Sequence, residues 1–452
     1  IMTLKRKLGL SAVMAVVVGD MIGSGVFFTP GELAAVATAE WQVYFFWSLC
    51  GLITLCGALT LAELAALIPK AGVSYHALTE AFGPFAGFMQ AWMMVLVSGP
   101  GAIAGVAILF GELANQVFGT RSDGMQTAWA AAAIVFFALI NLRGAEWGGR
   151  TQVLLTVVKV IGLAGLIVGG AILAAPAVSS GETAVAVDGG GVAGFVRFIG
   201  LGVAIVLFTY DGWIDASNVA GEVRNPNRNF PLAMGVGVVL ITCIYLLVNY
   251  AFLRVVPLEA MRENPTLVAS TVAEAAFGAA GGSFLNVLMW ISIFGALGGL
   301  IMTLPRLFYA AASEYSDRAA GTRLGPFFRT LSYLSEGRSV PSGAILFAAG
   351  VSIAALLFFG SFARIVNFFV VPFQFMNMLM VASIFRLRPR LSTPASYRLP
   401  GYPLVPAVFI VVMGLFLLTA IWFNPLDSLI GVGLTVAGAP VYRVLRNRGP
   451  AE

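Results

Sequence analysis

Apolar runs of about 20 residues recur along the whole chain, and each is long enough to cross a hydrocarbon layer of roughly 30 Å as a helix. Of the 452 residues, 59% are hydrophobic and only 10% are charged. In a typical soluble domain, about a quarter of the residues are charged. The sequence therefore predicts an all-α protein that crosses a membrane many times.

We place about twelve transmembrane spans along the chain. Their predicted boundaries are 8–37, 41–68, 84–117, 127–141, 151–174, 195–221, 232–253, 281–312, 342–359, 364–386, 403–423 and 426–445. The first run follows Lys5, Arg6 and Lys7, as a signal peptide would. It is too long for one and lacks a polar cleavage region, so we expect it to remain as a span.

The basic residues fall mostly on one side of these spans. Only five of the 26 Lys and Arg residues lie in predicted outer segments, and Lys159 lies inside a span. The five outer residues are Arg121, Arg197, Arg254, Arg262 and Arg364. By the positive-inside rule, this distribution places both termini in the cytoplasm, with the protein in the inner (plasma) membrane. Because orientation explains the net charge of +5, we expect no nucleic-acid partner.

All three cysteines lie within apolar runs. Cys50, Cys56 and Cys243 fall in predicted spans, and none lies in an outer loop. Structural disulfides form in oxidising compartments outside the cytoplasm. We therefore expect no structural disulfide and no disulfide-linked heavy-chain subunit.

The first span contains VGDMIGSGVFFTP, from Val18 to Pro30. Gly23, Ser24 and Gly25 lie near the middle of this span, where each glycine costs a helix about 1 kcal/mol relative to alanine. Close packing between helices is one explanation, because small residues let neighbouring backbones approach. A break in the helix is the other.

The sixth span has a second interruption. It contains FTYDGWIDASNVAGEVRNPNRNFP, from Phe208 to Pro231, with Asp211 and Gly212 near the predicted midplane. A central aspartate facing lipid would cost roughly 2.5–3.5 kcal/mol, so Asp211 is expected to face protein, water or a ligand. Breaks in the first and sixth spans fit two inverted repeats of five helices, in which half-helix ends bind ions near the midplane. Such a site suits a zwitterion.

The sequence resembles the amino acid–polyamine–organocation transporter superfamily, and most closely its bacterial L-type amino acid transporter branch. The resemblance extends over nearly the whole chain. Its motifs are GDMIGSGVFFTPG, AELAALIPKAGVSYHALTEAFGP, YDGW, GEVRNPNRNFP and PRLFYAAASE. It implies a LeuT-type fold with inverted repeats at 8–174 and 195–386 and two peripheral spans within 403–445.

The resemblance also implies a site for the two charges of an α-amino acid. The backbone amides of Ser24 and Gly25, together with Gly23, would bind the substrate carboxylate. The carbonyls of three further residues would face its amino group, and these are Ile22, Phe208 and Asp211.

The same resemblance places aromatic residues at the second break. Phe208 would close over the substrate as the outer gate. Tyr210 and Trp213 flank this break, where they would line the gate and pocket or pack against other helices.

Lys159 lies about eight residues inside the fifth span, too deep to reach water easily. In sodium-independent members of the superfamily, a lysine here resembles a fixed replacement for a bound sodium ion. Its ammonium would contact the carbonyls of Gly19 and Ile22. Asp20 departs from the neutral residue expected in this branch, and either pairs with Lys159 or acts as a proton site that couples transport.

Several other polar positions have two interpretations. Glu63 and Glu222 lie near inner helix ends, where they would form an inner gate or simple salt bridges. Ser98, Gly99 and Pro100 in the third span would form a packing kink, with pocket lining as the alternative.

Together these features predict a sodium-independent exchanger of neutral L-amino acids that works by alternating access and uses no cofactor or metal. A cationic amino acid or polyamine exchanger is an alternative, with Asp211 or Asp215 binding a distal cation, and a proton-coupled symporter is another. An enzyme is disfavoured because the chain has one histidine, no HExxH and no GxxxxGK[ST].

Overall fold

The computed structural model describes residues 4–120, 122–175, 192–317, 319, 321, 323–335, 338–359, 362–390, 396–423 and 425–446. These residues form helices joined by turns, and Leu8 and Val223 form an isolated β-bridge. Of the basic residues assigned to outer segments, Arg121 lies outside the described part, as do the side chains of Arg197 and Arg364.

The helices coincide with the spans expected from the apolar runs. Within the described residues, ten helical segments are long and apolar enough to cross a membrane, and shorter apolar helices lie at 198–209 and 342–358. Each predicted span overlaps one of these segments. The all-α polytopic fold predicted from the sequence is confirmed.

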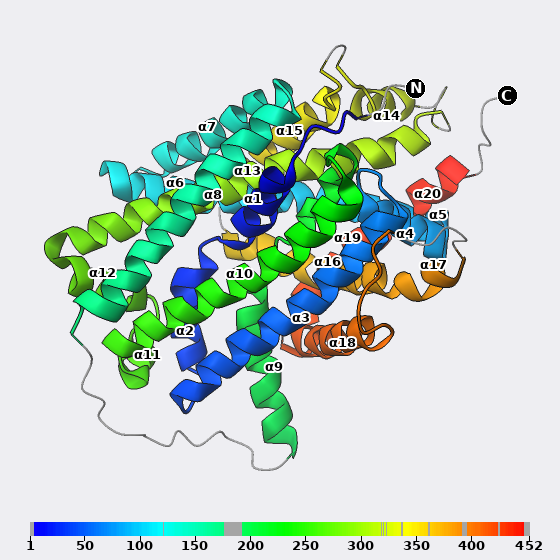
Figure 1. The fold of residues 1–452 in the computed structure, drawn as a ribbon. Helices are drawn as coiled ribbons and strands as arrows, with labels where there is room; N and C mark the ends of the chain where they lie inside the picture. The colour runs from blue at the N-terminus through cyan, green and yellow to red at the C-terminus, as the bar shows by residue number, and fades with distance from the viewer. Residues whose placement is uncertain are drawn as a thin grey trace.

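The first part of the chain, shown in blue to cyan in Figure 1, runs as far as the fifth span. Its elements are α1 (Leu10–Met21), α2 (Gly25–Ala34), α3 (Glu40–Leu67), α4 (Val73–Phe82), α5 (Pro84–Met93), the π-helical turn η1 (Met94–Ser98), α6 (Gly99–Phe118), α7 (Asp123–Leu142), α8 (Ala145–Val168) and the π-helical turn η2 (Gly169–Leu173). Proline at the first position of α5 suits a helix start, since the missing N–H would have no partner there.

The second part begins with the sixth span. Its elements are α9 (Val192–Thr209), the 3₁₀-helix η3 (Asp215–Glu222), α10 (Pro226–Val255), α11 (Leu258–Glu263), α12 (Val268–Phe277), the 3₁₀-turn η4 (Gly278–Ala280), α13 (Gly281–Tyr315), α14 (Gly325–Leu331), α15 (Ser342–Phe359), α16 (Phe362–Ala382), α17 (Ile384–Arg390), α18 (Leu404–Phe423), α19 (Pro425–Val436) and α20 (Gly438–Arg446).

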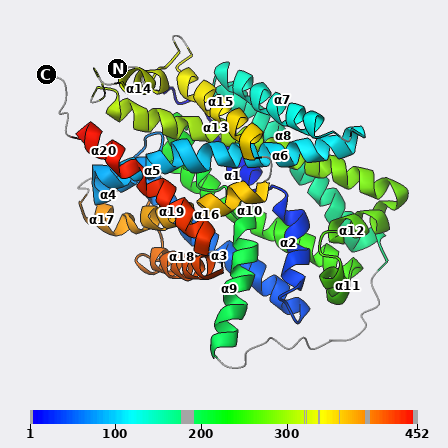
Figure 2. The ribbon, with the colours of Figure 1, turned by 180° about the vertical axis from the view of Figure 1, so that it is seen from behind.

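The interrupted first span lies inside the bundle. Helix α1 packs against α8, α10 and α13, while α2 packs against α9 and α11. Figures 1 and 2 show α2 continuing away from α1 alongside α9, and show α18 beside α3 and α9. The two half-helices before and after the first break therefore pack mainly against different helices, with α10 contacting both.

Candidate functional site

The first span breaks at Ile22–Ser24, between α1 and α2. Ile22 leaves the helical conformation at ψ 89°, and the Gly23 N–H turns back to donate a hydrogen bond to the Met21 carbonyl at 3.0 Å. Helix α2 then begins at Gly25. The first N–H groups of a helix have no partner within it, so those of Ser24 and Gly25 lie at the positive end of α2.

The sixth span breaks at Tyr210–Ile214, between α9 and η3. Gly212 has φ +108°, a conformation that side-chain-bearing residues rarely adopt. A Cβ at Gly212 would lie 2.8 Å from the carbonyl oxygen of Asp20, so the two breaks meet backbone to backbone. The inner half of this span is the short 3₁₀-helix η3, which follows the interruption expected from the sequence and ends at Glu222, beside the predicted span end at residue 221.

A cavity of about 170 Å³ lies where the breaks meet. The first break contributes Asp20, Met21, Gly23, Ser24 and Gly25, and the second contributes Phe208, Thr209, Asp211, Gly212 and Asp215. The other lining residues come from η1, α6, α13 and α16, and include Ser98 and Gly99 beside the wide turn of η1. Of the three residues for which the sequence offered a kink or pocket lining, Ser98 and Gly99 line the cavity and Pro100 does not.

Two carbonyls assigned to the substrate amino group already accept hydrogen bonds. Ile22 is buried outside the cavity wall, and its carbonyl accepts from Lys159 at 2.9 Å. The carbonyl of Phe208 accepts from the Asp211 N–H at 3.2 Å, while the Phe208 ring is 44% exposed and lines the cavity. Since a carbonyl oxygen has two lone pairs, each can accept one more hydrogen bond.

Lys159 of α8 is fully buried beneath the first break. Its Nζ donates hydrogen bonds to the carbonyl oxygens of Gly19 at 2.6 Å and Ile22 at 2.9 Å. Gly295 of α13 leaves room for it, because a Cβ there would lie 2.5 Å from Lys159 Cε. The ammonium thus lies at the carboxyl end of α1, where backbone dipoles favour a positive charge.

The sequence offered two roles for Asp20, a pair with Lys159 or a proton site. Among the salt bridges of the described residues, none joins these side chains. Instead, Asp20 Oδ1 accepts a hydrogen bond from Gln152 Nε2 at 3.1 Å, and Gln152 Nε2 also lies 3.2 Å from the Gly295 carbonyl oxygen. The Lys159 ammonium contacts the carbonyls at the end of α1, and the uncharged amide of Gln152 contacts the Asp20 carboxylate.

Gln152 is a residue that sequence reasoning missed. It lies seven residues before Lys159, which is about two turns of a helix, so both side chains share one face of α8. This seven-residue spacing is the feature of the sequence that could have indicated Gln152 as a neighbour of Lys159 at the first break.

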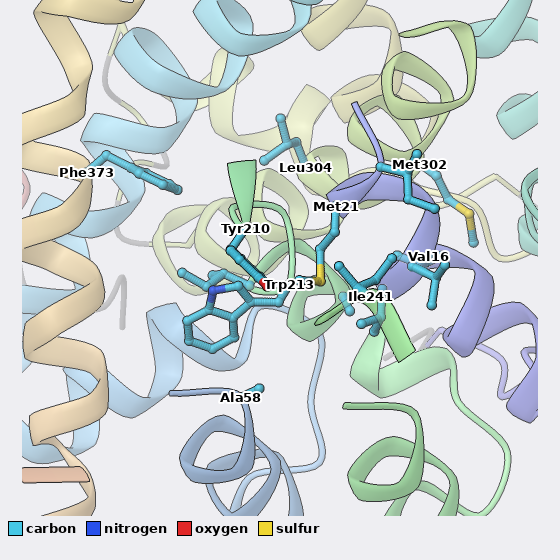
Figure 3. Close-up of a cluster of buried hydrophobic side chains, with 14 of the residues drawn as sticks. Val16, Met21, Ala58, Tyr210, Trp213, Ile241, Met302, Leu304 and Phe373 are labelled. Atoms are coloured by element: carbon cyan, nitrogen blue, oxygen red, sulfur yellow. The ribbon is translucent and has the colours of Figure 1, made fainter. Parts of the chain in front are cut away.

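Tyr210 and Trp213, for which the sequence offered either the gate and pocket or packing, do not line the cavity. The Tyr210 hydroxyl donates to the Trp47 carbonyl at 2.9 Å, and its ring packs against Tyr245. The Trp213 ring meets Phe409 of α18 edge to face at 5.9 Å. Figure 3 shows both aromatic residues in a cluster of buried hydrophobic side chains. These contacts fit the packing role, which was the other interpretation.

Tyr245 of α10 contacts the backbone at both breaks. Its hydroxyl lies 2.7 Å from the Met21 carbonyl oxygen and 3.2 Å from that of Thr209, within hydrogen-bonding distance of both helix ends. Thr209 Oγ1 also lies 2.7 Å from Thr29 Oγ1, which links α9 to α2. Little in the sequence pointed to Tyr245, because it occurs in an apolar span with no break.

Acidic residues at the ends of two spans form salt bridges. Glu222, at the end of η3, accepts from Arg306 Nε at 2.8 Å, and both side chains are buried. Glu63 lies 3.4 Å from Arg388 Nε and accepts from the Leu399 N–H at 2.8 Å. Both glutamates therefore form the salt bridges that the sequence offered as one interpretation.

Glu222→Ala should destabilise the protein strongly. The variant leaves the Arg306 guanidinium buried without its partner, which costs about 3–5 kcal/mol. Thermal unfolding of purified protein in detergent measures the effect. Glu146→Ala is the matched control, because its salt bridges are half exposed and are worth about 1 kcal/mol or less. Equal thermal-unfolding midpoints for Glu222→Ala and Glu146→Ala would contradict this expectation.

Comparisons with known proteins agree with this architecture. The family model described as amino acid permease matches residues 8–442. The serine/threonine exchanger SteT of Bacillus subtilis is 32% identical, and the aligned region covers 98% of this chain and 98% of SteT. The b(0,+)-type amino acid transporter 1 of Mus musculus is 29% identical over 92% of this chain and 83% of its own. The human cystine/glutamate transporter is 26% identical over 97% of this chain and 85% of its own. This chain belongs to the amino acid permease family and is a multi-pass membrane transporter of amino acids.

Proposed function

We propose that this protein is a sodium-independent exchanger of neutral L-amino acids. The observation that supports it best is the Lys159 ammonium on the carbonyls of Gly19 and Ile22. The Lys159 ammonium replaces a bound sodium ion at this helix end, because its positive charge neutralises the carbonyl dipoles that the break exposes. The inner half of the first span is then held against α8 without any free ion.

The substrate carboxylate binds at the amino end of α2. Gly23, Ser24 and Gly25 line the cavity there, and a Cβ at Gly23 would meet nothing within 4 Å. Backbone N–H groups and the helix dipole together favour an anion at such an end. The amino group binds beside the carbonyls of Ile22, Phe208 and Asp211, and the Phe208 ring closes the outer side.

Transport occurs by alternating access. Residues 8–174 and 195–386 act as two inverted repeats, and residues 403–445 lie outside that core. The half-helices of the first and sixth spans tilt against the remaining helices. The relative named a serine/threonine exchanger supports exchange as the mode of transport. The protein acts in the plasma membrane with both termini in the cytoplasm and without a disulfide-linked heavy chain.

A cationic substrate is the second candidate. Three carboxylates line the cavity, those of Asp20, Asp211 and Asp215, and none of the described lining residues is a Lys, Arg or His. A guanidinium or a second ammonium would find opposite charge there.

Counterflow in proteoliposomes distinguishes the two candidates. We expect vesicles preloaded with unlabelled alanine, serine or leucine to take up labelled serine without sodium. Vesicles preloaded with arginine or agmatine provide the competing test. Stimulation by arginine or agmatine alone would overturn the neutral-substrate proposal.

A further inference from the structure

A second cavity, of about 330 Å³, lies between α5, η1, α13, α14 and α20. It shares no described lining residue with the substrate cavity, and none of its described lining residues is charged. Figure 2 shows α5, α14 and α20 grouped at one end of the molecule. Most of the wall is aromatic, and the aromatic residues are Phe88, Trp92, Phe308, Tyr315, Phe327 and Phe328. The other lining residues are alanine, valine or leucine.

The polar atoms of this wall have partners outside the cavity. Trp92 Nε1 donates a hydrogen bond to the Leu434 carbonyl at 3.1 Å, and the Tyr315 hydroxyl donates to the Pro84 carbonyl at 3.4 Å. A buried water needs two to four polar partners, whereas apolar cavities of about 150 Å³ stay dry and bind small hydrocarbons. The second cavity therefore suits a hydrocarbon chain rather than water.

The cavity reaches the surface that faces lipid. Leu96 lines it within the third transmembrane span and is 43% exposed. A lipid chain can therefore enter from the side. Because lipid chains are as apolar as leucine, burying one here gives no hydrophobic gain over leaving it in the bilayer. Selection of a particular lipid has to come from its headgroup.

Aromatic contacts connect the two short helices at the edges of the cavity. Tyr442 of α20 lies 5.4 Å from Phe88 of α5, between ring centroids. The Phe88 ring lies 5.4 Å from Tyr315 of α13, which lies 6.1 Å from Phe328 of α14. Helices α14 and α20 thus lie against the same group of rings.

Both of these helices have exposed arginines in their last turns. They are Arg329 of α14 and Arg443 and Arg446 of α20, and no salt bridge among the described residues involves them. Two acidic residues lie near the end of α13, of which Glu314 already accepts a hydrogen bond from α4, and the other is Asp317. A basic helix with one buried apolar face is typical of the membrane interface, where arginines attract anionic lipids.

The turn η1 lies between the two cavities. Ser98 of this turn lines the substrate cavity, whereas Val95 lines the second one. Phe308 of α13 also lines the second cavity, and a Cβ at Gly99 would lie 2.9 Å from its Cζ. Gly99 itself lines the substrate cavity. A chain in the second cavity would therefore pack against the residues that hold this part of the substrate cavity in place.

We propose that the second cavity binds an acyl chain of an anionic phospholipid from the leaflet on the side of α14 and α20. The lipid phosphate lies against the arginines of these two helices, and the chain holds η1 in place and so raises the rate of transport. The apolar wall accommodates the chain, and the exposed arginines select the charge of the headgroup. The inference goes beyond the proposed function, because it does not depend on which amino acid is exchanged.

Fluorescence quenching tests lipid binding without any transport. The full chain is placed in phosphatidylcholine nanodiscs that contain an equal fraction of brominated phosphatidylglycerol or brominated phosphatidylcholine. We expect stronger quenching by the brominated phosphatidylglycerol, because Trp92 lines the cavity. Trp92→Phe should remove this difference. The chain has eight tryptophans, but those that face bulk lipid meet both brominated lipids equally.

A double variant tests the headgroup contact. Arg443→Gln with Arg446→Gln should lower the preference for phosphatidylglycerol by roughly tenfold or more, since each arginine near the headgroup is worth about fivefold in affinity. Arg150→Gln with Arg228→Gln is the matched control. It removes the same charge at exposed positions that do not line the cavity, and should keep the preference.

Counterflow of labelled serine into vesicles preloaded with unlabelled serine measures the effect on transport. The wild-type rate should rise severalfold as phosphatidylglycerol replaces phosphatidylcholine, and the Arg443→Gln, Arg446→Gln variant should lose this rise. Ala312→Leu fills part of the cavity without changing a charge, and should reduce both the quenching difference and the rise in rate.

Equal quenching by the two brominated lipids, or a difference that survives in Trp92→Phe, would overturn the lipid site. The cavity would then belong to another occupant, such as a second copy of this chain. A quenching difference with a counterflow rate that ignores phosphatidylglycerol would overturn the effect on η1. Absence of counterflow in every lipid would overturn the proposed function, while quenching in nanodiscs would still decide the lipid site.

Discussion

Lys159→Met should nearly abolish transport while the protein remains folded in detergent. Methionine has similar length but no charge, so the carbonyls of Gly19 and Ile22 lose their shared donor. Hydrogen bonds to a charged group are worth about 1.5–3 kcal/mol each, which corresponds to a loss of tenfold or more in rate if the inner half of the first span is no longer held. Counterflow per folded molecule measures this loss.

Lys70→Met is the matched control, because Lys70 is exposed in the connection between α3 and α4. It should keep the wild-type rate. Near-normal counterflow in Lys159→Met would remove the idea that this lysine replaces sodium. Recovery of Lys159→Ala by added sodium would support the idea directly, since the shorter side chain leaves space for an ion beside the carbonyls of Gly19 and Ile22.

Gly212→Ala should impair both stability and transport. The positive φ of Gly212 strains any other residue, by about 1–3 kcal/mol. The added Cβ would also lie 2.8 Å from the Asp20 carbonyl oxygen, and a backbone atom cannot move aside as a flexible side chain can. The two breaks would have to separate, which would reshape the cavity between them. Thermal unfolding in detergent and counterflow per folded molecule measure the two effects.

Gly350→Ala is a suitable control for this variant. Gly350 lies within α15, and a Cβ there would meet nothing within 4 Å. Alanine in a helix interior is favoured over glycine by about 0.5–1 kcal/mol, so the control should unfold at the wild-type temperature or slightly above it. A Gly212→Ala protein with wild-type stability and counterflow would show that the breaks do not need this close approach.

The sequence predicted the positions of the spans and breaks well, because both follow from local chemistry. An apolar run of sufficient length forms a helix in a membrane whatever its neighbours are. Glycines and an aspartate near the midplane are costly unless they serve a break, so GDMIGSG and YDGW were visible without a structure.

The directions of side chains around the breaks could not be predicted. Asp211 faces the cavity, whereas Tyr210 and Trp213 on either side of Asp211 and Gly212 turn towards α3 and α18. Outside a regular helix no fixed period relates neighbouring residues, so tertiary packing decides which ones face a ligand. The partner of Asp20 could not be predicted for a different reason, because Gln152 lies on another helix 132 residues away in the chain.

The most direct test of this account is sodium-free counterflow of labelled L-serine with competitors that lack one charge. The site proposed here needs both the carboxylate, for Ser24 and Gly25, and the ammonium, for the carbonyls at the second break. We predict rapid counterflow without sodium that unlabelled L-serine inhibits, and little inhibition by serinamide or by the hydroxy acid that lacks the amino group. A requirement for sodium, or inhibition by either analogue equal to that by L-serine, would contradict the account.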